Sequence, residues 1–185
     1  MNKAPIVFLI GFMGSGKTHL AKHVSGILTG KVIEMDSEIE KKYGAKIKDI
    51  FSEKGESYFR ELEREVLYEI IATNIHSTAP VLISTGGGTP CFYDNMEVMS
   101  GAGTTLYLRP SNIVLLRRLE KEKEERPLIR NKTRDEILEY IKQKVNEREK
   151  YYLKADIVFN PVNPDIGNLA QLVKEIIYSS FPYFG

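Results

Sequence analysis

The residues from Gly11 to Thr18 read GFMGSGKT and match the phosphate-binding motif G-x-x-x-x-G-K-[ST] at every fixed position. An apolar segment, Ile6–Ile10, comes just before them, and a stretch with helical periodicity, Lys17–Leu28, begins within them. Glycines let successive backbone amides point inward at phosphate oxygens, and the start of a helix adds the positive end of its dipole. The motif therefore predicts a site for the phosphates of a nucleotide, and the flanking elements argue against a chance match.

Within this phosphate-binding loop, Lys17 should neutralise the β- and γ-phosphates, and the Thr18 hydroxyl should be a ligand of Mg²⁺. We expect the nucleotide to be held at Gly14, Ser15, Gly16, Lys17, Thr18 and His19. GTPases carry the same loop but read guanine through an Asn-Lys-x-Asp motif. Neither Asn-Lys pair of the chain continues to Asp, and Asn131-Lys132 is followed by Thr and Arg, so a kinase is favoured over a GTPase switch.

Two carboxylates stand at the end of the second expected strand, Lys31–Glu34, in the sequence Glu34-Met35-Asp36. Ligands of parallel sheets bind beyond the carboxyl ends of the strands, so both carboxylates should face the phosphate site. Phosphoryl transfer needs one acidic group near the metal and one that accepts a proton from the attacking hydroxyl. The alternative is a pair of acidic residues that cap a helix over Asp36–Tyr43.

The third expected strand, Val81–Ser84, is followed by Gly86-Gly87-Gly88. Three glycines at this end of a strand would allow a ligand to approach bare backbone amides, although a flexible turn would also explain one or two of them.

Arg148 fills the missing position of a helical apolar series, which comprises Leu138, Ile141, Val145 and Tyr152. A guanidinium on the inward side of a helix needs an anion, because an unpaired buried charge is costly. That anion is either a ligand or a glutamate of the core. Arg60 lies at the border of the apolar face of another helical stretch, whose apolar positions are Phe59, Leu62, Val66 and Ile70.

Arg126 lies in the charged segment Lys121–Arg134, KEKEERPLIRNKTR, which also contains Pro127 and has little apolar content. The segment is either an ordinary solvated loop or a mobile flap whose Arg126 swings onto the transferring phosphate.

Short apolar strands position these residues and alternate with longer helical stretches. The expected strands are Ile6–Ile10, Lys31–Glu34, Val81–Ser84, Thr104–Leu108 and Asp156–Asn160. This alternation predicts an α/β fold with a parallel sheet covered on both faces. Short helical pieces within Asp36–Phe59 indicate an inserted substrate-holding region.

Length and composition fit one domain, because the chain has 185 residues with 26 Lys and Arg against 25 Asp and Glu, a formal net charge of +1. This balance gives no reason to expect nucleic acid or an anionic membrane as partner. The single cysteine, Cys91, cannot form an internal disulfide, and no Cys/His spacing resembles a zinc site. The apolar run Pro5–Ile10 is too short to span a membrane, so we expect a cytoplasmic protein.

Taken together, these segments resemble shikimate kinase. The likeness is carried by GFMGSGKT, EMDSEIE, ESYFRELE, a strand ending in GGG, RPL in a charged segment, and EREKYY, in the order that the family shows. It implies an adenylate-kinase-like P-loop fold of three layers with a five-stranded parallel sheet. It also implies one domain over residues 1–185, with a substrate-binding insert at about 35–63 and a lid at about 119–134.

The resemblance further implies transfer of the γ-phosphate of Mg·ATP to the 3-hydroxyl of shikimate. Asp36 would hold that hydroxyl and act as the base, and Arg126 would reach the phosphates from the lid. Arg60 and Arg148, with the Gly87 or Gly88 amide, would bind the substrate carboxylate, a task that suits the two parallel hydrogen bonds of a guanidinium. ATP and shikimate would be the partners of a monomer.

Two positions depart from the family pattern. Glu34, a predicted metal-site residue, stands where the family usually has Asp, and the stretch Asn160–Pro164, where the family packs near adenine, aligns poorly.

One rival hypothesis is another small-molecule kinase of this architecture, such as a gluconate kinase. A second is a nucleotide-binding regulatory protein without activity, which the presence of both Lys17 and Asp36 argues against.

Overall fold

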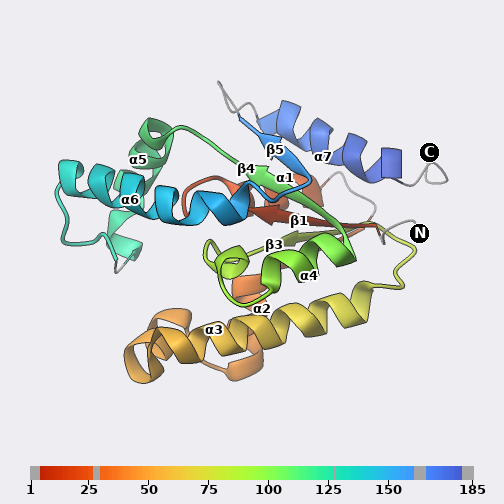
Figure 1. The fold of residues 1–185 in the computed structure, drawn as a ribbon, viewed down its shortest axis with the longest axis horizontal. Coiled ribbons are helices and arrows are strands. Elements are labelled where there is room, and N and C mark those ends of the chain that lie inside the picture. The colour runs from red at the N-terminus through yellow and green to blue at the C-terminus, as the bar shows by residue number, and fades with distance from the viewer. Residues whose placement is uncertain (1–4, 27–29, 127, 161–165, 181–185) are drawn as a thin grey trace.

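The computed structural model describes residues 5–26, 30–126, 128–160 and 166–180. A five-stranded sheet forms its centre (Figure 1), in the order β2-β3-β1-β4-β5. The strands are β1 (Ile6–Ile10), β2 (Lys31–Glu34), β3 (Val81–Ser84), β4 (Thr104–Leu108) and β5 (Ile157–Phe159). All four strand pairs are parallel, so the predicted fold class is confirmed. The predicted fifth strand, Asp156–Asn160, is one residue too long at each end.

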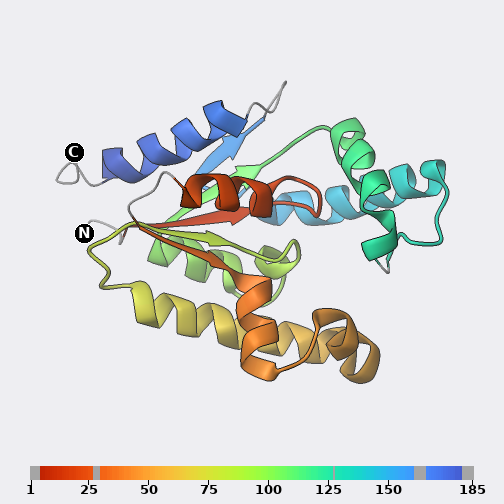
Figure 2. The ribbon, with the colours of Figure 1, turned by 180° about the vertical axis from the view of Figure 1, so that it is seen from behind.

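Helices cover both faces of the sheet, as Figure 1 and Figure 2 show from opposite sides. The helices are α1 (Lys17–Ser25), α2 (Met35–Tyr43), α3 (Ile47–Asn74), α4 (Asn95–Ala102), α5 (Asn112–Lys121), α6 (Arg134–Tyr152) and α7 (Ile166–Ser180), with 3-10 turns η1 (Thr89–Cys91) and η2 (Lys123–Glu125). Val7 and Leu9 of β1 share an apolar cluster with α1 and α7, whereas Ile6, Phe8 and Ile10 share one with α3, α4 and α6. Side chains of a strand alternate between the two faces, so every residue of β1 is buried.

The region between β2 and β3 is helical, as expected, but α3 is longer than its apolar periodicity indicated. It contains one residue with non-helical backbone angles, Gly55, at φ 81° and ψ 176°. A positive φ is strained for residues with a side chain, and glycine adopts it freely. Gly55 therefore divides α3 into a short first piece and a long second one. The expected helix Lys17–Leu28 ends at Ser25, and Leu28 lies outside the described residues.

At the residues that the structure describes, the charged segment between α5 and α6 is exposed or half-buried, with one exception. Ile129 has no exposed surface and joins the apolar cluster that contains Leu119 of α5 and Ile137 of α6. The prediction of a solvated segment is therefore wrong at Ile129, because this side chain anchors the segment between its flanking helices. Pro127 lies outside the described residues. No helix in the described part of the chain has the length and apolar character needed to cross a bilayer.

Candidate active site

The phosphate-binding loop leaves β1 and enters α1 at the carboxyl edge of the sheet, where it lines a cavity of about 700 Å³. Gly11, Gly14 and Gly16 have φ values of 141°, 76° and 103°, so the loop uses backbone conformations that favour glycine. A Cβ atom on Gly14 would also lie 3.1 Å from Leu119 Cγ, which leaves little room for a side chain. The loop has the shape that presents backbone amides to phosphate oxygens.

Lys17 lies at the floor of this cavity, with 7% of its surface exposed. Its Nζ atom donates hydrogen bonds to the carbonyl oxygens of Gly11 at 2.7 Å and Phe12 at 3.1 Å. Burial lowers the pKa of Lys17 to about 8, against the opposing effect of the Asp36 carboxylate. The loop carbonyls only partly balance the positive charge of the Lys17 ammonium. Phosphate oxygens would supply the negative charge that balances it fully.

Thr18 and Glu34 form the part of the cavity that fits a metal ion. Thr18 Oγ1 donates to Glu34 Oε2 at 3.2 Å. Burial raises the pKa of Glu34, and the Ser84 and Thr18 hydroxyls oppose that shift. Glu34 Oε1 is buried and has no hydrogen bond of acceptable geometry within the described residues, so a metal-bound water could fill this place.

Mg²⁺ prefers oxygen ligands of this kind and is commonly held by one or two protein oxygens together with substrate phosphates. The residues present therefore fit this ion. The described residues contain no cluster of three His, Cys, Asp or Glu that would hold a metal without a nucleotide.

Asp36 follows Glu34 on the first turn of α2 and lines the same cavity as Lys17. Its side chain reaches solvent through the open cavity, but the surrounding protein raises the pKa of its carboxyl, with the Lys17 ammonium opposing the shift. A Cβ atom on Gly86 would lie 2.4 Å from Glu63 Oε1 and 3.2 Å from Asp36 Oδ1. A side chain at Gly86 would clash with these two carboxylates. Flexibility alone therefore does not explain the first glycine after β3.

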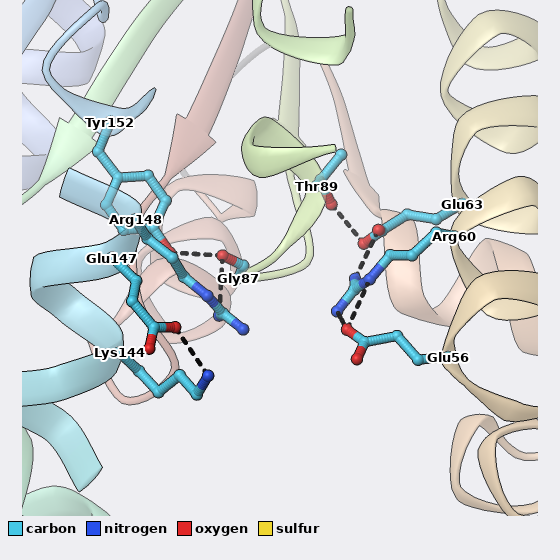
Figure 3. A network of polar contacts seen from close by, with 9 residues as sticks. All are labelled: Glu56, Arg60, Glu63, Gly87, Thr89, Lys144, Glu147, Arg148 and Tyr152. Atoms are coloured by element: carbon cyan, nitrogen blue, oxygen red, sulfur yellow. Dashed lines mark hydrogen bonds and ion pairs between the residues drawn. The ribbon is translucent and has the colours of Figure 1, made fainter. Parts of the chain in front are cut away.

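Arg60 projects from α3 toward the turn Gly86–Gly88 that follows β3, called the glycine turn below. Two carboxylates hold its guanidinium (Figure 3). Its Nη1 donates to Glu63 Oε2 at 2.7 Å, while Nε and Nη2 both donate to Glu56 Oε1, at 3.2 and 2.9 Å. Glu63 also accepts a hydrogen bond from Thr89 Oγ1 at 2.5 Å. A Cβ atom on Gly88 would lie 2.6 Å from Arg60 Nη1, so the guanidinium lies directly against the turn.

Arg148 approaches the same turn from α6, on the opposite side (Figure 3). Its Nη1 lies 3.4 Å from the Gly87 carbonyl oxygen, which also accepts a hydrogen bond from Tyr152 Oη at 2.5 Å. The Arg148 guanidinium lies 5.6 Å from the centre of the Phe12 ring. The alternative of a core glutamate as its partner is not observed in the described part of the chain, so the group remains able to bind a ligand anion.

Arg126 lines the cavity from the segment between α5 and α6. Its guanidinium pairs with Glu122, and its Nε lies 3.0 Å from Glu122 Oε2. A contact with a transferring phosphate would require Arg126 to exchange this carboxylate for phosphate oxygens.

The cavity lining brings together most of the predicted site residues, namely Gly14, Ser15, Gly16, Lys17, Thr18, His19, Glu34, Asp36, Gly87 and Arg126. The other three, Arg60, Gly88 and Arg148, do not belong to this lining and meet beside it at the glycine turn.

Sequence reasoning missed three further features. Arg118 lines the cavity and donates from Nη1 to the carbonyl oxygens of Gly14 and Ser15, each at 2.9 Å. Tyr152 was expected only to pack, yet it also bonds Gly87. The carboxylate partners of Arg60 stand four residues before it and three after it, a spacing that places all three on one helix face and could have revealed them.

A P-loop at the carboxyl edge of a five-stranded parallel sheet, with an acidic residue and arginines beside it, defines a P-loop kinase. A family model described as shikimate kinase matches residues 13–178. The shikimate kinase of Parabacteroides distasonis is 42% identical over 154 residues, which are 83% of this chain and 86% of that protein. The shikimate kinase of Sulfurihydrogenibium sp. is 39% identical over 171 residues, 92% of this chain and 95% of that protein.

Solved structures agree with the sequence relatives. The crystal structure of shikimate kinase from Bacteroides thetaiotaomicron has a TM-score of 0.83 at 38% identity, over 93% of this chain and 97% of that one. Shikimate kinase from Acinetobacter baumannii in complex with shikimate has a TM-score of 0.81 at 29% identity, over 97% and 96%. The chain belongs to the shikimate kinase family, whose members are ATP-dependent phosphotransferases.

Proposed function

We propose that this chain transfers the γ-phosphate of Mg·ATP to the 3-hydroxyl of shikimate, giving shikimate 3-phosphate and ADP. The observation that carries this proposal is that a predicted phosphate site and a predicted carboxylate site meet at the glycine turn. The phosphate-binding loop and Asp36 line one cavity, and Arg60 and Arg148 reach the turn that closes it. The shikimate kinase family and the shikimate complex of a relative support the choice of acceptor.

In this proposal Asp36 holds the attacking hydroxyl and accepts its proton as the new O–P bond forms. Asp36 lines the same cavity as Lys17, which supports a base close to the group that would neutralise the phosphates. The raised pKa of Asp36 makes it a better proton acceptor than an ordinary aspartate. Lys17 and, after a change of partner, Arg126 stabilise the charge that develops on the transferred phosphoryl group.

The metal ion is proposed to be Mg²⁺, held by the Thr18 hydroxyl and, directly or through water, by Glu34 together with ATP oxygens. When bound, it neutralises phosphate charge and orients the phosphates for attack. The 3.2 Å hydrogen bond between Thr18 Oγ1 and Glu34 Oε2 supports a site in which both residues bind one ion. Glu34, longer by one methylene than the aspartate usual in the family, reaches Thr18 from the last residue of β2.

Arg60 and Arg148 are proposed to bind the substrate carboxylate, with the Gly87 or Gly88 amide as a third donor. They approach the turn from opposite sides, which suits a ligand held between them (Figure 3). We further propose one domain with a substrate-binding insert at about 35–63 and a lid at about 119–134, acting as a cytoplasmic monomer. One cysteine in 185 residues is compatible with a reducing compartment.

The test is a coupled ADP-release assay with shikimate, gluconate and nucleoside monophosphates as acceptors. We expect turnover with shikimate, and turnover of gluconate without shikimate would instead identify another small-molecule kinase. Nucleotide binding without turnover of any acceptor would favour the regulatory protein.

A further inference from the structure

Arg60 is bound by two carboxylates that differ sharply in their surroundings. The Glu63 side chain is 1% exposed and has a second bond, to Thr89, so it is fixed in place. The Glu56 side chain is 55% exposed and uses a single oxygen to accept from both Nε and Nη2 of Arg60. Glu63 is therefore fixed in the core, whereas Glu56 can leave Arg60 and become hydrated.

The charges around Arg60 do not favour a further anion while Glu56 is in place. Glu63 already cancels the charge of Arg60, and Glu56 adds a second carboxylate to the same guanidinium. Nearby, Lys144 and Glu147 form a neutral pair at 2.7 Å. A substrate carboxylate arriving between Arg60 and Arg148 would thus meet two carboxylates on the same guanidinium.

We propose that Glu56 occupies the Nε and Nη2 edge of Arg60 in the free enzyme and that the carboxylate of the acceptor displaces it. This inference rests on the proposed function, because it takes Arg60 as the group that binds the acceptor carboxylate. Glu56 acts as an internal competitor and sets the affinity for the acceptor below what Arg60 and Arg148 alone would give.

Two features make the displacement inexpensive. An exposed carboxylate that leaves an ion pair regains its hydration, so such pairs contribute little net free energy. Glu56 also follows Gly55 directly, where the helical geometry of α3 is interrupted. The backbone on one side of Glu56 is therefore not constrained by a regular helix, whereas Glu63 lies well inside the second piece.

Isothermal titration calorimetry of the 185-residue protein with shikimate tests the proposal. Glu56→Gln keeps the shape and removes the charge, and Glu56→Ala removes the competing oxygen altogether. Glu53→Gln is the matched control, because Glu53 is an exposed carboxylate three positions earlier, in the first piece of α3 before Gly55. We expect both Glu56 variants to bind shikimate about threefold to fivefold more tightly than the parent, and the control to match the parent. Titration with ADP should give the same Kd in all four proteins.

The outcomes separate the proposal from the function on which it rests. If the parent binds shikimate and the Glu56 variants bind it equally or more weakly, Glu56 positions Arg60 and the competitor role is wrong, while the function stands. If the parent does not bind shikimate, both are wrong. Tighter binding in Glu56→Ala as well as Glu56→Gln supports the competitor role, since a residue needed only to orient Arg60 would lower affinity when truncated.

Discussion

Replacement of Glu63 by alanine should destabilise the protein far more than loss of an exposed ion pair of the same length. Glu63 is buried, and its Oε2 lies 2.7 Å from Arg60 Nη1. Removal of one partner from a buried ion pair costs about 3–5 kcal/mol, because the remaining charge has left water without compensation. Arg60 keeps Glu56 as a partner, so the lower end of this range applies. The Thr89 hydroxyl also loses its acceptor, which adds about 1 kcal/mol.

The control is Glu97→Ala. Glu97 pairs with Lys154 at the same 2.7 Å, but the two side chains are 58% and 52% exposed. Exposed pairs contribute about 0–1 kcal/mol, so burial is the variable that the comparison isolates. Glu63→Gln is a useful intermediate, because it can still accept from Thr89 while it removes the charge.

Urea unfolding followed by circular dichroism gives the free energy of unfolding of each variant. A loss of about 3–4 kcal/mol for Glu63→Ala corresponds to a Tm lower by roughly 6–16 °C for a chain of this size. Glu63→Gln should lose less, and Glu97→Ala should lie close to the parent. The reasoning would be refuted by a Glu63→Ala variant that is no less stable than Glu97→Ala.

Four further predictions concern the cavity and its surroundings. Lys17→Ala should lower kcat by about 100- to 1,000-fold, since the developing phosphate charge loses its buried ammonium; near-parent turnover would contradict that role. Arg148→Ala should weaken shikimate binding by about 2–5 kcal/mol, measured by calorimetry, and an unchanged Kd in a folded variant would make Arg148 structural. The kcat/KM for ATP should be bell-shaped in pH. It falls on the acid side as Asp36 is protonated at a pKa above the ordinary 3.8, and on the alkaline side as Lys17 loses its proton near a pKa of about 8; a flat profile would oppose both assignments. Limited proteolysis between residues 119 and 134 should slow when ADP and shikimate are both bound, and equal cleavage rates would rule out a closing lid.

The fold class could be predicted because its signal is local. Each strand is a short apolar run, and a run without alternation indicates burial on both faces, as the fully buried β1 shows. The phosphate-binding loop is likewise contained in eight consecutive residues, so its chemistry could be inferred without knowledge of the tertiary structure.

The parts that sequence reasoning missed depend on contacts between distant residues. Arg118 reaches carbonyl groups of Gly14 and Ser15 that lie more than a hundred positions earlier. Glu63 lies between apolar residues of α3 and would ordinarily be read as a solvent-facing charge. The spacing from Arg60 indicates an ion pair on the same face, but the burial of Glu63 also depends on Thr89, 26 positions later. Ile129 is buried because two helices converge on it, which its charged neighbours conceal.

The turn after β3 lies against both the phosphate-binding loop and the Arg60 side chain. A Cβ atom on Gly87 would lie 3.2 Å from the backbone nitrogen of Met13 in the phosphate-binding loop, and Gly88 lies against Arg60. The turn therefore lies between the phosphate-binding loop and the proposed acceptor site. Any displacement of this turn changes the shape of both sites at once, so mutations here should alter the apparent affinities for the two substrates together.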